Sequence, residues 1–174
     1  MANNLIPFKK IGTTSNLRRG TVMHTANQVA NRLLELADDV GRPLTPMQLI
    51  KLVYLCQGWM LGIKGRPLFR EPVEAWAYGP VVRSVYDAVR RYRDQPVSEK
   101  ILEDETKFDD EEEDIIKQTF DQYGKLPGLA LSTLTHKDGS PWSITHETLG
   151  RNGTISNDLI QGHFYELAHR GTSS

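Results

Sequence analysis

Residues 45–64 read TPMQLIKLVYLCQGWMLGIK, and this stretch predicts the helix around which the rest of the chain is organised. Thr45 and Gln48 have the spacing of a capping box, in which the side chain of each residue accepts a hydrogen bond from the backbone N–H of the other. Pro46 falls at the first helical position, where a missing N–H costs nothing. These signals predict a helix that begins at Pro46.

Apolar side chains surround most of this predicted helix. Gly58 and Gly62 lie on the same side as Lys51, and they would let another backbone approach closely. A helix that is apolar on nearly all sides belongs inside a domain, so we predict that residues 45–64 form a central buried helix. The broad apolar face consists of Leu49, Leu52, Val53, Cys56, Trp59, Met60 and Ile63, and a second stripe of Ile50, Tyr54 and Leu61 lies roughly opposite.

The composition favours a single globular domain. The chain has 174 residues, of which 39% are hydrophobic and 25% charged, which is enough to bury a core. The net charge of -1 gives no support for binding to nucleic acid or to a membrane surface. No apolar run approaches the roughly 18 residues of a membrane span, and the N-terminus lacks the apolar block of a secretory signal. We therefore expect a cytoplasmic protein.

Further helix signals predict a mainly α fold, a compact helical domain around the central buried helix. A second capping box, Thr25 with Gln28, begins a helix before the central one, and Asp109 caps an acidic helix after it. Residues 127–134 form a short helix, and Ser140 and Ser156 cap two more. We predict a flexible extension at residues 1–23, the domain at 24–168 and a polar tail at 169–174.

A small extended or β element interrupts the helices near residues 73–78. The sequence VEAWAY is typical of a short strand. Gly79 ends this segment, and we expect Pro80 to open the next helix. Residues 150–153 are expected to form a loop.

The sequence contains no motif that predicts catalysis, and we expect neither a metal nor a cofactor. None of the five histidines has the spacing of a metal site such as HExxH, and there is no GxSxG motif or Walker loop. The single cysteine, Cys56, excludes an internal disulfide. A thiol–imidazole pair of Cys56 with His136 is conceivable, but the position of Cys56 on the apolar face argues against it.

Two aromatic segments are candidate binding surfaces. One is residues 76–81, WAYGPV, and the other spans Thr135-His136 and Ser140-Pro141-Trp142. Aromatic side chains on rigid loops lose little entropy when a partner covers them, which makes them good anchors. Alternatively, Trp76 and Trp142 complete a small core while His136 hydrogen-bonds a turn. Lys51 likewise either reaches solvent or pairs with an acid at a functional cleft.

Three blocks of the sequence resemble the Panacea domain family, which comprises phage-associated and SocA-like or GepA-like proteins. The resemblance covers residues 24 to about 165, and it rests on KLxYLxQGW, GRPLF, EAWxYGPV and THxxGSPW in this order. The family's fold is mainly helical with a small extended element, in agreement with the prediction above. The blocks are LIKLVYLCQGWMLGIKGRPLFREPVEAWAYGPVVRSVYDAVRRY (49–92), YGKLPGLALSTLTHKDGSPW (123–142) and ISNDLIQGHF (155–164).

The resemblance implies a non-enzymatic antitoxin of a bacterial or prophage toxin–antitoxin system with a role in phage defence. Its partner would be a cognate toxin encoded nearby, which it neutralises by direct binding. Some family members carry an extra DNA-binding domain, for which residues 1–23 leave no room, and this argues against direct DNA binding. The motif positions carried over as partner-binding residues are Lys51, Tyr54, Gln57, Trp76, Tyr78, Gly79, Pro80, His136 and Trp142.

Two other functions are weighed against neutralisation by masking. The first is a proteolysis adaptor, whose second partner would be a cytoplasmic AAA+ protease that receives the bound protein. The second is a hydrolase that uses His136 with an acidic partner.

Overall fold

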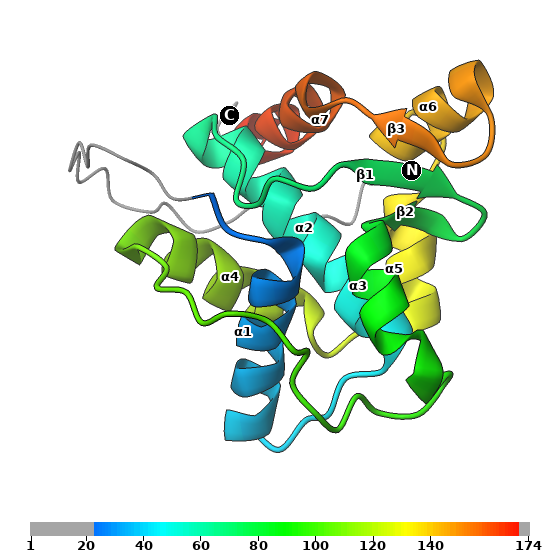
Figure 1. Ribbon diagram of the computed structural model, residues 1–174. Helices are drawn as coiled ribbons and strands as arrows, with labels where there is room; N and C mark the ends of the chain where they lie inside the picture. The colour runs from blue at the N-terminus through cyan, green and yellow to red at the C-terminus, as the bar shows by residue number, and fades with distance from the viewer. Residues whose placement is uncertain (1–22, 171–174) are drawn as a thin grey trace.

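A computed structural model describes residues 23–170. The predicted extension at residues 1–23 lies outside the described residues except for Met23, and so does the end of the chain from residue 171. The mainly α fold is confirmed, because helices make up most of the described chain and a small sheet completes it (Figure 1).

Helix α2 (Pro46–Lys64) is the predicted central helix. Its capping box is complete: Thr45 Oγ1 accepts from the Gln48 N–H, and Gln48 Oε1 accepts from the Thr45 N–H at 2.9 Å. The helix ends at Gly65, which has a left-handed conformation with φ +70°. All its residues from Leu49 to Gly62 are buried, because neighbouring elements cover α2 on every side.

The other helices surround α2. Figure 1 shows α1 (Ala26–Asp39) and α4 (Asp110–Tyr123) on one side of α2, and α3 (Arg83–Val89) with α5 (Gly128–Thr135) on the other. A 3-10 turn, η1 (Arg90–Tyr92), follows α3, and α6 (Pro141–Leu149) and α7 (Asn157–His169) lie near the sheet. The predicted helix caps are confirmed at Thr25, Asp109, Ser140 and Ser156.

The two glycines of α2 allow α7 to approach closely, as predicted. A Cβ atom placed on Gly58 would lie 2.3 Å from Phe164 Cε2, and one placed on Gly62 would lie 2.7 Å from the backbone carbonyl carbon of Phe164. The Phe164 ring then packs edge-on against Trp59, with the ring centroids 5.0 Å apart. The glycines therefore seat α7 directly on α2.

A three-stranded antiparallel sheet has the order β2-β1-β3. It consists of β1 (Val73–Trp76), β2 (Gly79–Val81) and β3 (Gly153–Ile155). The predicted extended element is confirmed as β1. The expectation that residues 150–153 form only a loop is wrong at Gly153, which pairs with Ala75 of β1. Three residues are too few for an alternating pattern, and β3 forms because β1 offers it an edge.

The expectation that Pro80 opens a helix is also wrong. Pro80 pairs with Ala75 in β2, and α3 begins only at Arg83. Gly79 has φ +109°, which turns the chain back on itself instead of ending the strand. Because β2 is an edge strand, a proline without an N–H is tolerated there.

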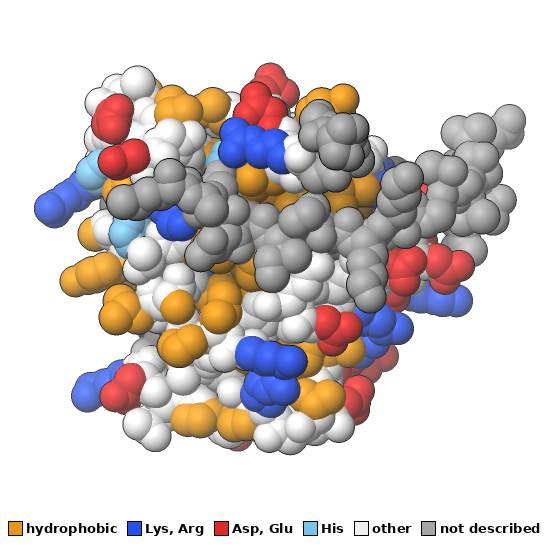
Figure 2. Space-filling view, turned by 180° about the vertical axis from the view of Figure 1, so that it is seen from behind, with side chains coloured by type: hydrophobic (Ala, Val, Ile, Leu, Met, Phe, Trp, Pro, Cys, Tyr) orange, Lys and Arg blue, Asp and Glu red, His pale blue; other side chains and the backbone are white. Residues whose placement is uncertain are grey.

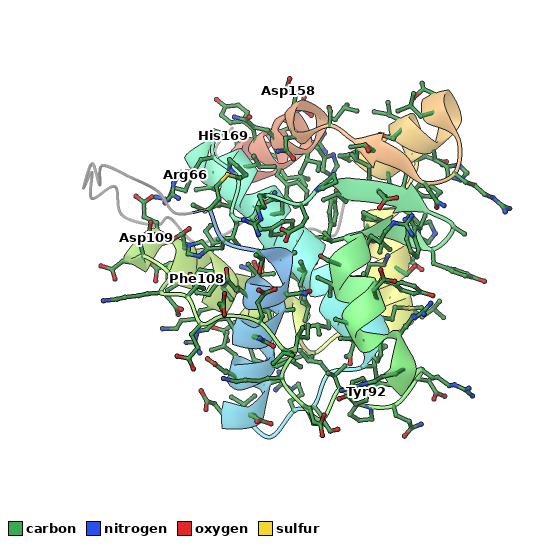
Figure 3. The ribbon with its side chains drawn as sticks, in the orientation of Figure 1. Arg66, Tyr92, Phe108, Asp109, Asp158 and His169 are labelled. Atoms are coloured by element: carbon green, nitrogen blue, oxygen red, sulfur yellow. The ribbon has the colours of Figure 1, made fainter. Side chains whose placement is uncertain are left out.

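An ionic cluster ties the start of α4 to the turn after α2. Arg66 donates to Asp109 at 3.0 Å, and Glu112 bonds the buried His24 at 2.9 Å. Figure 3 shows Arg66 and Asp109 together on the left of the molecule, away from the β1–β2 hairpin on the right. The acidic run of the sequence therefore begins a helix and pairs with basic groups there, as a helix dipole favours.

Candidate partner-binding surface

Lys51 is a buried lysine beneath the β1–β2 hairpin. Only 2% of its surface is exposed, and its Nζ atom donates a hydrogen bond to the carbonyl oxygen of Pro80 at 3.0 Å. No carboxylate of residues 23–170 forms an ion pair with it. Burial lowers the pKa of the Lys51 ammonium to about 7, because a desolvated charge is disfavoured. The charge of Lys51 is therefore sensitive to what surrounds it near neutral pH.

Gly79 makes room for the Lys51 ammonium. A Cβ atom on Gly79 would lie 3.0 Å from Lys51 Nζ and 3.3 Å from Thr135 Oγ1, closer than most Cβ contacts in proteins. The positive φ of Gly79 also disfavours any other residue at this turn. The turn thus strongly favours glycine here, and the close Lys51 and Thr135 atoms leave little room for a side chain.

Three side chains from three helices hold the hairpin by its backbone carbonyl groups. Besides Lys51 of α2 at Pro80, Ser132 of α5 donates its hydroxyl to the Tyr78 carbonyl, and Trp142 of α6 donates its indole N–H to the Trp76 carbonyl at 2.6 Å. The two aromatic segments predicted from the sequence are thereby joined into one unit. A hairpin held in this way has little freedom left to lose on binding.

His136 lies beside this unit. Its ring centroid is 5.2 Å from that of Trp142, and its Nδ1 atom is 3.4 Å from the Ser132 hydroxyl. The His146 ring stacks on the Trp142 ring, with the two ring centroids 4.7 Å apart. The Trp142 ring is therefore held by two imidazoles and one hydrogen bond, and it serves as a support for β1.

The tip of the hairpin is exposed. The Tyr78 side chain is 70% exposed although the Tyr78 carbonyl is bound by Ser132. Beside it, a groove of about 350 Å³ runs between the start of α2, the hairpin and the α3–η1 segment. We call this the hairpin groove. Its lining includes Met47, Ile50, Lys51, Trp76, Tyr78, Tyr86, Arg90 and Arg93.

A second apolar area lies on α5. Leu129 is 72% exposed, and a shallow depression lies between α5 and the end of α4. Figure 2, seen from behind, shows hydrophobic side chains gathered on the left of this face, on the side where Figure 1 places α5. Since α5 also supplies Ser132 to the hairpin, the two apolar areas are carried by neighbouring elements.

Tyr54 and Gln57 lie in the interior, although the sequence placed them with the binding residues. Tyr54 is 2% exposed, and its ring packs edge-on against Phe164. Gln57 is fully buried and bonds the backbone of Leu68 and Phe69. We therefore assign both to the core, because neighbouring elements cover the sides of α2 on which they lie.

Sequence reasoning included Thr135 in the second aromatic segment, but it did not identify Ser132, Tyr86, Arg90 or Arg93 as parts of this region. Ser132 and Thr135 are buried polar residues of a short helix. The Thr135 hydroxyl bonds carbonyl groups of its own helix, whereas the Ser132 hydroxyl bonds the Tyr78 carbonyl of the hairpin that packs against α5. The signal available for Ser132 was its place one helical turn before His136, within the block at residues 123–142.

Cys56 and His136 have separate environments. Cys56 is buried, and burial raises the pKa of its thiol to about 12, while His136 contacts Ser132 and Trp142 instead. Within residues 23–170, no group of three or more His, Cys, Asp or Glu side chains could hold a metal ion. Across the same residues, no helix has the length and hydrophobicity to cross a membrane.

Comparison with known proteins identifies the family. The chain is similar to Antitoxin SocA of Caulobacter vibrioides (strain NA1000 / CB15N), with 28% identity over 137 residues covering 73% of each chain. No solved structure matches it significantly. The family model described as "Antitoxin SocA-like, Panacea domain" matches residues 49–143, more than half of the chain, from the centre of the fold to the start of α6. The chain therefore belongs to the SocA-like Panacea domain family.

Proposed function

We propose that this protein is the antitoxin of a toxin–antitoxin pair and neutralises a toxin encoded beside it by direct binding. Membership of the SocA-like Panacea family and the similarity to Antitoxin SocA support this function. We place the pair in the bacterial cytoplasm and on a phage-derived element, as the family resemblance implies.

The observation that carries the proposal is the rigid presentation of the hairpin. Side chains of three helices bind the carbonyl groups of Trp76, Tyr78 and Pro80, while the Tyr78 ring remains 70% exposed. A large aromatic ring on a preformed support is a strong binding anchor, because ordering it costs little entropy. Such a surface fits a protein that masks a partner and performs no chemistry of its own.

The direct test is co-expression with the product of the neighbouring gene. We expect restored growth and a stable complex that co-purifies. If the neighbour is toxic, yet growth is not restored and no complex forms, the proposal is wrong.

The half-life of the toxin separates masking from delivery to a AAA+ protease. Masking leaves the half-life unchanged or longer, whereas an adaptor shortens it. A pulse-chase measurement with and without this protein, in cells with and without the candidate protease, decides between the two.

A hydrolase that depends on His136 is tested in the same cells. The masking proposal expects His136→Ala to leave most of the neutralisation intact, because no acid is paired with this imidazole within the described chain. Complete loss of neutralisation in a folded His136→Ala variant that still binds the toxin would favour a catalytic role, whereas loss of both would assign His136 to the binding surface.

A further inference from the structure

The hairpin groove is lined by three basic side chains and, among the described residues, by no acidic one. Arg90 and Arg93 are exposed at its rim, and Lys51 is buried at its side. None of the three forms an ion pair with a carboxylate of residues 23–170. The groove thus presents positive charge that the described part of the chain leaves unmatched.

Neighbouring arginines on the same segment behave differently. Arg83 binds Glu74 with two hydrogen bonds, and Arg91 binds Glu99 at 3.2 Å. These two arginines, which do not line the groove, are therefore paired within the fold, while the two that line it are not. This separation indicates that the charge of the groove is available to a ligand.

The interior of the groove is apolar. The buried Ile50 lines it, and the rings of Trp76 and Tyr86 pack edge-on with their centroids 4.7 Å apart. A volume of about 350 Å³ lies at the low end of ligand-sized sites, so it suits one or two side chains better than a folded element. An apolar centre with a basic rim is complementary to an apolar side chain flanked by carboxylates.

We propose that the hairpin groove binds a short segment of the toxin in which an apolar side chain is flanked by acidic side chains. This inference rests on the proposed function and names the chemistry that its partner presents. The apolar side chain packs against Ile50, Trp76 and Tyr86. The flanking carboxylates meet the guanidinium groups of Arg90 and Arg93, which bind carboxylates in a bidentate manner.

Other occupants fit the groove less well. Residues 1–22 of this chain contain no Asp or Glu, so they do not complement the basic rim. Nucleic acid requires an extended basic track, whereas here three basic groups surround a narrow apolar groove on a chain of net charge -1.

The test selects ligands without using the toxin. The full-length protein is immobilised and panned against a random dodecapeptide library at 150 mM salt. We expect enrichment of peptides in which Leu, Ile, Phe or Trp stands beside Asp or Glu. The variant Arg90→Gln with Arg93→Gln should weaken binding of these peptides at least tenfold, as measured by fluorescence anisotropy.

A matched control variant, Arg91→Gln with Arg170→Gln, removes the same charge outside the groove and should bind within twofold of the wild type. Circular dichroism confirms that both variants fold. Labelled methionine methyl groups locate the peptide: the Met47 signal at the groove should shift, while that of the core residue Met60 should not.

Three outcomes would overturn the inference: selection of peptides without acidic residues, equal weakening in both double variants, or a shift of Met60 without Met47. Binding of single-stranded DNA or phosphatidylglycerol vesicles in place of peptides, with loss in the Arg90/Arg93 variant, would assign the groove to another ligand. Because the toxin is absent, failure here with intact neutralisation contradicts the groove chemistry alone. Failure of neutralisation with successful selection contradicts the proposed function alone.

Discussion

Lys51 and Gln57 are two buried polar residues of the same helix, and their hydrogen bonding differs. Gln57 Oε1 accepts from the Leu68 N–H at 2.7 Å and from the Phe69 N–H at 3.3 Å, while its Nε2 donates to the Phe69 carbonyl at 3.0 Å. Lys51 has one protein acceptor, the Pro80 carbonyl. A lysine ammonium carries three donors, so Lys51 keeps donor capacity that the described chain does not use.

This difference separates a folding role from a binding role on one helix. Gln57 holds the backbone at residues 68–69 in place, and both polar atoms of its side chain already have partners, so a ligand could add little to its hydrogen bonding. Lys51, by contrast, supports the hairpin through the Pro80 carbonyl and borders a groove with unmatched positive charge. Since burying a charge with few partners costs stability, Lys51 fits a residue retained for function more than for folding.

Leu52→Asp should unfold the helix that carries both Lys51 and Gln57, and it has the largest expected effect. Leu52 is fully buried, and an unpaired carboxylate there costs more than about 5 kcal/mol, comparable to the whole stability of a domain. We expect loss of the folded state by circular dichroism. Met47→Asp on the same helix, at a position 37% exposed, is the control and should remain folded. A folded Leu52→Asp protein would contradict the central role of α2.

Gln57→Leu should lower the stability of the fold without affecting the binding surface. It leaves the backbone groups of Leu68 and Phe69 buried without partners, which costs about 2–5 kcal/mol. Urea unfolding should show this loss, with neutralisation retained at temperatures where the variant is folded. Gln118→Leu, at a partly exposed position on α4, is the control and should change stability by less than about 0.5 kcal/mol. If Gln57→Leu weakened toxin binding without lowering stability, Gln57 would be a binding residue and not a folding residue.

Lys51→Met should impair toxin binding and leave the protein folded. Because burial lowers the folded-state pKa of Lys51 to about 7, the unfolded chain binds more protons above that pH, and wild-type stability should rise with pH. Between pH 7 and 8.5 this contribution reaches at most about 2 kcal/mol. The variant should lose that rise, retain its fold and neutralise poorly. Comparing urea unfolding of both proteins at each pH cancels other titrating groups, such as Cys56. An unfolded variant would show that Lys51 is structural, whereas an unchanged slope would show that folding does not lower the pKa of Lys51.

Tyr78→Ala should have the smallest effect on stability, within about 0.5 kcal/mol, because the side chain is 70% exposed. We expect at least tenfold weaker toxin binding by calorimetry, as for a central aromatic anchor. Tyr165→Ala on α7, 54% exposed and outside the hairpin groove, is the control and should bind normally. Equal binding by both variants would remove Tyr78 from the interface.

The sequence predicted the helices well because their signals are local. The capping boxes at Thr25 and Thr45 and the caps at Asp109 and Ser140 each depend on residues within one turn. Two glycines on one side of α2 likewise predicted the close approach of another backbone, and the structure identifies that backbone as α7. The same reasoning failed at Pro80 and at Gly153, because short strands depend on a pairing partner that lies far away in the chain.

The candidate surface likewise has features that the sequence predicted and features that only the structure revealed. From its motifs, the sequence by itself determined the family, the buried central helix and the two aromatic segments. Only the tertiary structure decided that Lys51, Ser132 and Trp142 bind the carbonyl groups of every second residue of one hairpin, and that Tyr54 and Gln57 belong to the core. The physical reason is that periodicity shows which side of a helix is apolar, whereas the partner of a buried polar group depends on what packs against that side.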